Sequence, residues 1–386
     1  MSVLERFEMA PEARPQELRI FGMANGDPRD PRTASGISSR LFDRFERDGY
    51  LAGAVSSLPT GFSDLVVRMR SIAPTKSAWR SRYRLSMPMT RAFERAAFGR
   101  MAAAHRETQY DAFFQIGAYC NVSSVVTRPI FTYHDNDVLT MVRLDPRMRG
   151  TDPSSSDVRN RAAYEKSVFD SAARIFTFSD WSARLIAANY DISPGRLEVV
   201  GAGSNIDHNL LAGERDYGAR HALFIGVDFE RKGGPDVLRA FAKVRQQLPS
   251  ARLTIVGELP AGQIAPGVVS LGLVRGQGAL SAIIRSASLF VMPSVWEPFG
   301  IVFLEAMAAA IPCIGADAFA MPEIIGDTGS VVPPNDVERL AREMHTYLAD
   351  EALCAERGRA ARERYLQHYG WDRVESRIVA AMKRHL

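Results

Sequence analysis

Residues 291–310 read VMPSVWEPFGIVFLEAMAAA, and this stretch decides how the rest of the chain is interpreted. It begins as the end of an apolar strand, turns at a Pro-Ser pair and continues as a Trp-Glu-Pro-Phe-Gly loop. Ile301, Leu304, Ala308 and Ile311 then recur at helical spacing with good helix formers between them, which predicts a helix. A strand, a short loop and a helix in this order are typical of an α/β fold.

Two carboxylates flank the start of this predicted helix. Glu297 precedes the helix and Glu305 lies inside it, eight residues later. Eight helical steps cover roughly 12 Å, on the order of the separation between the sugar and the ribose of a nucleotide sugar. The first free N–H groups of the helix lie between the two carboxylates and attract an anion such as a diphosphate. One extended ligand therefore suits this segment, with Glu297 at the sugar and Glu305 at the ribose.

The pattern E-P-F-G-x-x-x-x-E-A-M, after an apolar strand and Pro-Ser, resembles the signature of the retaining glycosyltransferases of family 4, the glycosyl transferases group 1. The resemblance covers about residues 18–380. It implies the GT-B fold, in which two doubly wound, Rossmann-like α/β domains face a central cleft. It also implies that a hexose moves from a nucleotide-diphosphate sugar to an acceptor hydroxyl with retention, without a metal and without a cofactor.

Length and composition fit this interpretation. The chain has 386 residues, of which 46% are apolar and 24% charged, as expected for a globular protein of about two domains. Its three cysteines are widely spaced and form no metal or redox motif, so reduced thiols in the cytoplasm are expected. No secretory signal and no run of about 18 apolar residues is present.

Two consecutive strand–helix series predict the domain division. Residues 1–212 are expected to form a Rossmann-like domain that binds the acceptor, and residues 213–368 a second one that binds the nucleotide sugar. Residues 369–386 are expected to form a helix that returns to the first domain, as the resemblance implies.

The first predicted strand, residues 17–23, leads through a loop rich in Gly, Asp and Pro to a helix. Gly36, Ile37 and Ser38 lie where that helix begins, so its backbone N–H groups are expected to meet an anionic ligand. An ordinary helix start capped by Ser35 is the alternative.

His134 ends the predicted strand 129–134, at the carboxyl end where ligands gather in open α/β sheets. The resemblance implies that this histidine donates or accepts hydrogen bonds near the transferred sugar and is not a general base. Residues 135–137, Asp-Asn-Asp, also fit the D-x-D pattern of metal-dependent glycosyltransferases of the other main fold. Three residues are a weak match, and the metal-free alternative is favoured.

The loop after the predicted strand 221–226 carries two cations. Arg231 and Lys232 precede a Gly-Gly pair, and two positive side chains beside flexible backbone suit a diphosphate. In the resemblance, Lys232 matches a lysine of the family, whereas Val227 stands where an arginine is usual. Arg231 is therefore expected to supply the second cation.

The resemblance extends these assignments to a full site. The catalytic set is expected to be His134, Arg231, Lys232 and Glu297, with the two cations stabilising the departing diphosphate. The donor is expected to contact Gly36, Ile37, Ser38, Gly226, Gly257, Val274, Pro298, Phe299, Gly300, Ile301 and Glu305. The base is commonly contacted through backbone near Val274, so UDP and GDP both stay open. The two glutamates are too far apart for the pair of retaining glycosidases at about 5 Å, which favours front-face attack with a phosphate oxygen as base.

Besides Val227, three positions depart from the family pattern. Ala310, Ala320 and Met321 stand where glycines are frequent, so the shape of the sugar pocket stays open. Val227, Ala310 and Ala320 motivate one alternative to glycosyl transfer, a non-catalytic protein that binds sugar nucleotides. The other alternative is a different GT-B enzyme of sugar nucleotides, such as a phosphorylase or an epimerase.

Residues 66–106 hold ten Lys or Arg against a single acid, Glu94. Met89, Phe93, Ala96, Ala97 and Met101 share one face of a predicted helix in this segment. Such a helix suits an anionic membrane surface, which would place the protein peripherally on the inner face of the membrane. It suits equally a glycan, lipid-linked or otherwise anionic acceptor, or an ordinary solvated face over a core stripe. No nucleic-acid recognition motif accompanies the charge.

Overall fold

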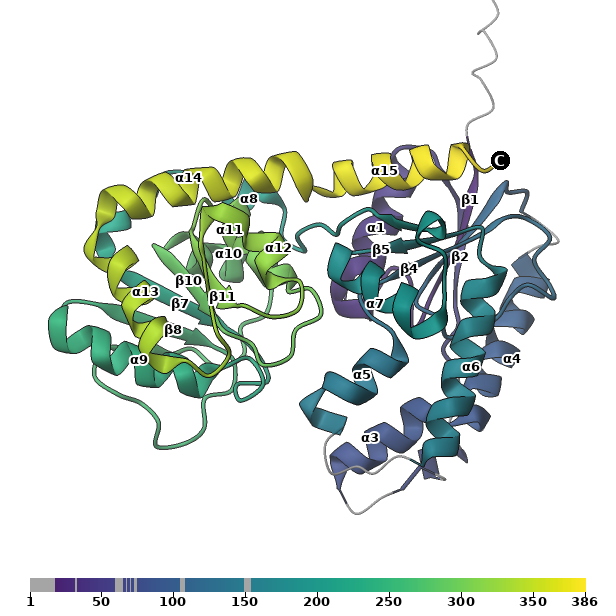
Figure 1. The fold of residues 1–386 in the computed structure, drawn as a ribbon. Coiled ribbons are helices and arrows are strands. Elements are labelled where there is room, and N and C mark those ends of the chain that lie inside the picture. The colour runs from purple at the N-terminus through teal and green to yellow at the C-terminus, as the bar shows by residue number, and fades with distance from the viewer. Residues whose placement is uncertain are drawn as a thin grey trace, which may run out of the picture.

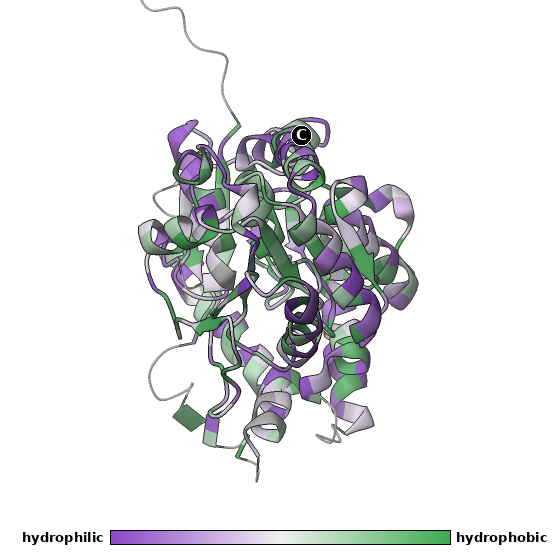
Figure 2. Ribbon diagram, turned by 90° about the vertical axis from the view of Figure 1, so that its left-hand side faces the viewer, coloured by the Kyte–Doolittle hydropathy of each residue, from purple (hydrophilic) through white to green (hydrophobic). Residues whose placement is uncertain are grey.

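The computed structural model describes residues 18–31, 33–59, 65–66, 68–69, 71–72, 75–104, 108–148 and 154–386. Within these ranges the chain forms two α/β units, each built around a six-stranded sheet (Figure 1). All described strand pairs are parallel. Figure 2 shows hydrophobic residues concentrated along the central strands, as expected for sheets that are covered on both faces.

The first unit has the strand order β2-β1-β3-β4-β5-β6. Its strands are β1 Ile20–Ala24, β2 Leu51–Ser56, β3 Ala112–Ile116, β4 Ile130–His134, β5 Arg174–Thr177 and β6 Leu197–Val199. Its helices include α1 Ile37–Arg47, α3 Lys76–Leu85, α4 Met87–Ala104, α5 Val138–Leu144, α6 Ser155–Ser171 and α7 Asp180–Tyr190. The order reverses between β1 and β3, and ligands of such sheets bind at the carboxyl ends of the strands beside that reversal.

The second unit has the strand order β12-β11-β10-β7-β8-β9, which is 3-2-1-4-5-6 in reverse when numbered within the sheet. Its strands are β7 His221–Ile225, β8 Arg252–Val256, β9 Val268–Ser270, β10 Leu289–Met292, β11 Cys313–Ala316 and β12 Ser330–Val332. Its helices include α9 Gly234–Gln247, α10 Gln277–Arg285, α11 Ile301–Ala308, α12 Met321–Ile325, α13 Val337–Ala349 and α14 Glu351–His368. The reversal lies between β7 and β10, whose following loops are 226–233 and 293–300.

The C-terminal helix α15, Trp371–Lys383, joins the second unit back to the first. Figure 1 shows α14 and α15 following one another along one side of the molecule, with α14 over the second unit and α15 over the first. Arg44 of α1 pairs with Glu375 of α15 at 2.6 Å and with Asp372 at 2.8 Å. The Trp371 indole N–H donates to the Ser204 carbonyl at 2.8 Å, where the chain first leaves the first unit.

The helix predicted from the opening stretch is present but shorter than its apolar spacing indicates. α11 ends at Ala308, and Ala310 adopts a left-handed backbone with φ of 57°. A non-glycine residue in this conformation stops a helix. Ile311 is buried beyond the helix, on the way to β11.

The apolar face of the basic segment is not available to a lipid surface. Met89, Phe93, Ala97 and Met101 of α4 are buried and pack with the sheet residues around Phe113 in one cluster. The expectation that this stripe lies on lipid headgroups is therefore wrong, since an apolar stripe at helical spacing serves equally as a core contact. Among the described helices, none has the length and apolar character needed to cross a membrane.

Candidate active site

The carboxyl ends of both sheets border one cavity of about 600 Å³. The first unit contributes the loops after β1, β3 and β4, including Ile37 and His134. The second unit contributes the loops after β7 and β10, including Arg231, Glu297 and Pro298. The volume lies within the usual range for small-molecule sites. The two sequence segments that carried the predicted chemistry thus meet at the reversal point of the second sheet.

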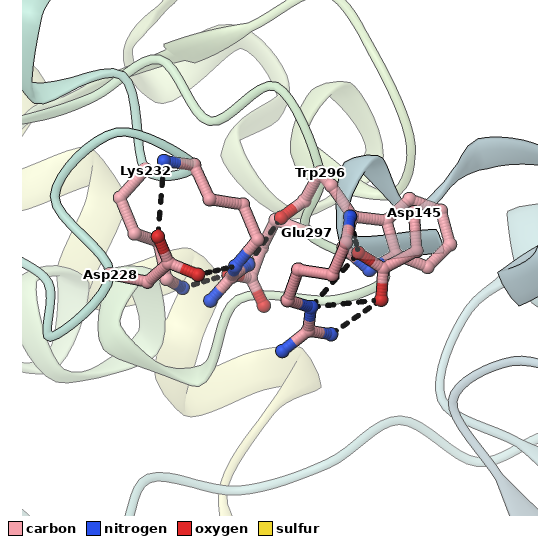
Figure 3. A network of polar contacts seen from close by, with 7 residues as sticks. Asp145, Asp228, Lys232, Trp296 and Glu297 are labelled. Carbon is pink, nitrogen blue, oxygen red and sulfur yellow. Dashed lines mark hydrogen bonds and ion pairs between the residues drawn. The ribbon is translucent and has the colours of Figure 1, made fainter. Parts of the chain in front are cut away.

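Arg231, Lys232 and Glu297 form a connected polar network at this reversal point (Figure 3). The Lys232 ammonium forms an ion pair with the Glu297 carboxylate. The Arg231 guanidinium donates to the Asp228 carboxylate at 3.0 Å and to the Trp296 carbonyl at 2.5 Å, and lies 3.6 Å from the Glu297 carboxylate. Two cations therefore converge on one carboxylate beside the start of α11.

Burial, and next the neighbouring Arg231, lower the pKa of Lys232 to about 7. The Glu297 carboxylate beside the ammonium works in the opposite direction, because an adjacent anion favours the charged form. Lys232 is therefore a cation whose charge depends on its neighbours, and an additional anion at this point will favour protonation.

Two glycines shape the loops around this network. Gly233 has φ of 80° and caps α9, and a Cβ there would lie 2.3 Å from the Pro293 carbonyl oxygen. Gly300 has φ of 98° and caps α11 without a side-chain hydrogen bond. Both glycines adopt conformations that other residues resist. The first lets the two loops touch, and the second leaves the first N–H groups of α11 without a side-chain cap.

The other predicted donor contacts surround the network without all lining the cavity. Ile37, His134, Arg231, Glu297 and Pro298 line it. Gly226 and Gly257 lie back to back, since a Cβ on Gly257 would lie 2.0 Å from the Gly226 carbonyl oxygen. Phe299 is buried and packs edge-on against Phe178 of the first unit at 5.4 Å. Val274 is half-buried, and Ile301 is the first residue of α11.

Glu305 is buried on α11, outside the residues that line the cavity. Burial raises its pKa to about 7, against the lowering effects of a hydrogen bond from the Asn205 backbone and of the Arg40 charge. Arg40 of α1 donates to the Asn205 carbonyl at 2.5 Å. In this structure the second glutamate of the signature therefore contacts the segment that connects the two units.

The start of α1 lies in the same region. Gly36 is the N-cap with φ of 89° and no side-chain cap hydrogen bond, and the alternative of a cap by Ser35 lies outside the described side chains. A Cβ on Gly36 would lie 2.8 Å from the Asn205 side-chain oxygen. The Ser38 hydroxyl is buried and donates to the Thr33 carbonyl at 3.1 Å. Gly36 and Ser38 thus shape the loop, and Ile37 reaches the cavity.

His134 is buried at the end of β4, and its ring packs edge-on against Phe169 at 5.0 Å. Burial, and next the Arg161 charge, lower the pKa of His134 to about 3. The imidazole is therefore neutral at neutral pH. A neutral ring forms hydrogen bonds but is a weak base at this pKa.

The residues that follow His134 have structural partners. Asp137 caps α5 by accepting from the Thr140 backbone N–H at 2.9 Å, and it also accepts from Asn189 at 3.0 Å. Among the described residues, no group of three or more His, Cys, Asp or Glu side chains is arranged to hold a metal ion.

Contacts between the two units were missed by sequence reasoning. Trp296 of the signature loop packs edge-on against Phe319 at 5.2 Å and against Trp181 of α7 at 6.4 Å. Glu323 of α12 accepts hydrogen bonds from the backbone N–H groups of Asp180 at 3.0 Å and of Trp181 at 3.3 Å. A carboxylate at a helix start is stabilising. The Trp in the W-E-P-F-G loop was the one available signal for this contact.

The architecture defines the class of protein: two Rossmann-like domains with a cavity between the carboxyl ends of their sheets form the GT-B fold, as predicted. Solved structures agree, since a sucrose-phosphate synthase from Thermosynechococcus elongatus superposes with a TM-score of 0.69 at 16% identity, covering 95% of this chain and 99% of that one. An alpha,alpha-trehalose-phosphate synthase (UDP-forming) from Burkholderia vietnamiensis superposes with a TM-score of 0.70 at 12% identity, covering 96% and 98%.

Residues 219–350, within the second unit, match the family Glycosyl transferases group 1, which confirms the predicted resemblance to that group for this part of the chain. A D-inositol 3-phosphate glycosyltransferase of Streptomyces avermitilis is 30% identical over 259 residues, which cover 58% of this chain and 55% of that protein. An alpha-maltose-1-phosphate synthase of Mycobacterium tuberculosis is 40% identical over 178 residues, which cover 41% and 46%. The chain thus spans about half the length of the curated relatives it matches.

Proposed function

We propose that this protein is a retaining glycosyltransferase that moves a hexose from a UDP- or GDP-sugar to an acceptor hydroxyl without a metal or a cofactor. One observation carries the proposal. Arg231, Lys232 and Glu297 converge at the start of α11, at the reversal point of the second sheet, and Arg231 and Glu297 line one cavity together with His134. The family match of the second unit and the sugar-transferring relatives support it.

In the proposed donor complex, the diphosphate lies between Lys232, Arg231 and the first N–H groups of α11. Lys232 exchanges its ion pair with Glu297 for the phosphate oxygens. Glu297, released from this pair, accepts hydrogen bonds from the hydroxyls of the sugar. Fixed cations and a helix start stabilise the charge that develops on the leaving diphosphate, in a site shielded from water.

The acceptor enters from the first unit. His134 is neutral because burial and Arg161 lower its pKa to about 3, so its proposed role is to orient the sugar by hydrogen bonding. The base for the acceptor proton is then an oxygen of the departing phosphate, which leaves on the face where the acceptor attacks. Retention of the anomeric configuration follows from attack on that face.

Contacts between the units support closure over the substrates. The edge-on contact of Trp181 with Trp296 attaches the loop that holds Glu297 to α7 of the first unit. The Glu323 carboxylate at the start of α7 reinforces it. Closure of this kind excludes water, which limits hydrolysis of the donor.

We also propose a lipid-linked acceptor and a peripheral membrane contact, made through a surface other than α4. Leu65, Met69 and Ile72 are 52%, 59% and 65% exposed, at the start of the basic segment 66–106 or directly before it. Exposed apolar residues among cations suit an anionic lipid surface. Sedimentation with anionic vesicles should remove the protein from solution, and the double variant Met69→Glu with Ile72→Glu should abolish this. Equal sedimentation of the variant would exclude this surface.

Calorimetric titration with a panel of UDP- and GDP-sugars, with and without EDTA, tests the donor site. We expect one nucleotide sugar to bind equally in both conditions, and Lys232→Ala to weaken its binding. Arg239→Ala, which removes an exposed arginine on α9, is the matched control and should bind as the wild type. Binding of no donor, or binding that EDTA abolishes, would contradict the proposal. Donor binding without any transfer would favour the non-catalytic alternative.

A further inference from the structure

Three residues that line the cavity each carry a buried polar atom with no hydrogen-bond partner among the described residues. The atoms are Oδ1 of Asn25, Nε2 of His134 and Nη1 of Arg161. All three belong to the first unit and follow or face the carboxyl ends of its strands. Buried polar atoms are nearly always paired in folded proteins, so three such atoms on residues that line one cavity indicate a ligand that pairs with them.

Arg161 on α6 is held in place but keeps one end of its guanidinium available. Its side chain is only 7% exposed, its Nη2 donates to the Ala118 carbonyl at 2.9 Å, and the guanidinium lies over the Tyr164 ring at 5.7 Å. These contacts fix its orientation. The unpaired Nη1 is therefore a donor with a defined position at the cavity.

The ion pair of Arg161 with Glu165 is long. Oε1 of Glu165 lies 3.9 Å from Nη2, beyond hydrogen-bonding distance. The other oxygen of Glu165 accepts from the Val138 backbone N–H at 2.8 Å and from the Tyr190 hydroxyl. A buried guanidinium without a close anion is unfavourable. The cavity end at Arg161 thus favours an anion.

We infer that Arg161 binds an anionic group of the acceptor, a carboxylate or a phosphate, while Asn25 binds a hydroxyl beside it and His134 borders both the acceptor and the transferred sugar. The inference rests on the proposed function and names its acceptor class as a small anionic polyol. The donor diphosphate is assigned to Arg231 and Lys232 of the second unit, so the two anions are bound by different units. Arg161 and His134 both line the cavity, and the Arg161 charge contributes to the lowered pKa of His134.

Ring-labelled histidine NMR tests this inference, because the His134 signal reports an anion beside Arg161. The protein is first saturated with the nucleoside diphosphate, UDP or GDP, that binds the donor site. Inorganic phosphate and acetate are then titrated separately, with chloride holding the ionic strength constant. The His134 signal is assigned by its absence in His134→Gln.

We expect a saturable shift of the His134 signal in the wild type. Arg161→Gln should weaken binding of the anion at least about tenfold, because a charge-assisted hydrogen bond in a buried site is lost. Arg159→Gln, an exposed position on the same helix, is the control and should bind as the wild type. Arg161→Lys keeps the charge and should retain saturable binding, which separates loss of the charge from a folding defect. Tighter binding of phosphate than of acetate assigns a phosphorylated acceptor, and the reverse a carboxylate.

A shift that does not saturate, or equal affinity in the wild type and Arg161→Gln, would overturn the inference. If the nucleoside diphosphate binds and neither anion does, the inference fails while the donor site stands. If no nucleoside diphosphate binds, the proposed function itself fails. The two failures are therefore distinguishable in one series of samples.

Discussion

The pH dependence of donor binding follows from Lys232. Burial and Arg231 lower the pKa of this lysine in the free protein to about 7, whereas an ordinary lysine stays charged to a much higher pH. A diphosphate binds the protonated form. Donor affinity should therefore be highest below about pH 7, where Lys232 is protonated, and fall as the pH rises through that value.

The magnitude follows from the protonated fraction. One pH unit above a pKa, about one molecule in eleven carries the proton, so affinity should fall close to tenfold per unit until the pKa of the bound form is reached. The loss is bounded by the interaction itself, about 1.5–3 kcal/mol for a charge-assisted hydrogen bond, or roughly ten- to 150-fold. The nucleotide sugar is the appropriate ligand, because both of its phosphates are esterified and keep their charge over this range.

Calorimetry at constant ionic strength, from one unit below to two units above the pKa of Lys232, measures this dependence. Lys232→Arg should bind the donor with almost no change over the same range, because arginine stays protonated. Lys232→Ala should bind the donor weakly, and its affinity should also stay constant over this pH range. A flat profile in the wild type, or the same slope in all three proteins, would refute the reasoning.

Three further predictions concern the surroundings of this site. Gly233→Ala should lower the free energy of unfolding by more than the about 1–2 kcal/mol that a left-handed alanine costs, because the added Cβ would lie 2.3 Å from the Pro293 carbonyl oxygen. Denaturant unfolding compared with Gly99→Ala, where the added Cβ meets no atom within 4 Å, measures this difference. Equal unfolding free energies of the two variants would contradict it. Trp181→Ala should remove the edge-on contacts with Trp296 and Phe319, of about 0.5–1.5 kcal/mol each, and shift the fluorescence of Trp296. Trp79→Ala is the control and should leave the Trp296 fluorescence unchanged. Unchanged Trp296 fluorescence in both variants would exclude the contact between Trp181 and Trp296. Burial raises the pKa of Glu305 in the folded protein to about 7, so the stability of the wild type should fall by on the order of 3 kcal/mol as the pH rises from the ordinary glutamate pKa through 7. Glu305→Gln should remove this pH dependence of stability. A variant whose stability follows that of the wild type over this pH range would contradict the assignment.

The part of the site that lies close in sequence could be predicted. The E-P-F-G pattern predicted the end of β10, the loop and the start of α11, and the Arg-Lys pair before two glycines predicted the neighbouring loop. Both predictions used local rules for turns, helix starts and charge. The ion pair between Lys232 and Glu297 then follows from the strand order, because β7 and β10 are neighbours.

Contacts that depend on tertiary packing could not be predicted in this way. The stripe on α4 was compatible with lipid or core, and only the position of the sheet beneath it decides between them. Arg161 gives no local signal, since an arginine within an amphipathic helix usually faces solvent. Trp181 and Phe319 are far apart in sequence and meet only when the two units face one another. The missed roles depend on contacts between elements that are far apart in sequence.

Proton NMR of the reaction in EDTA measures most directly whether transfer proceeds with retention and without a metal. The anomeric proton of the first-formed product, with an acceptor or with water as a slow substitute, reports the configuration before mutarotation. We expect release of nucleoside diphosphate together with a product that has the same anomeric configuration as the donor. An inverted product, or transfer that stops in EDTA and resumes with a divalent metal, would contradict this expectation.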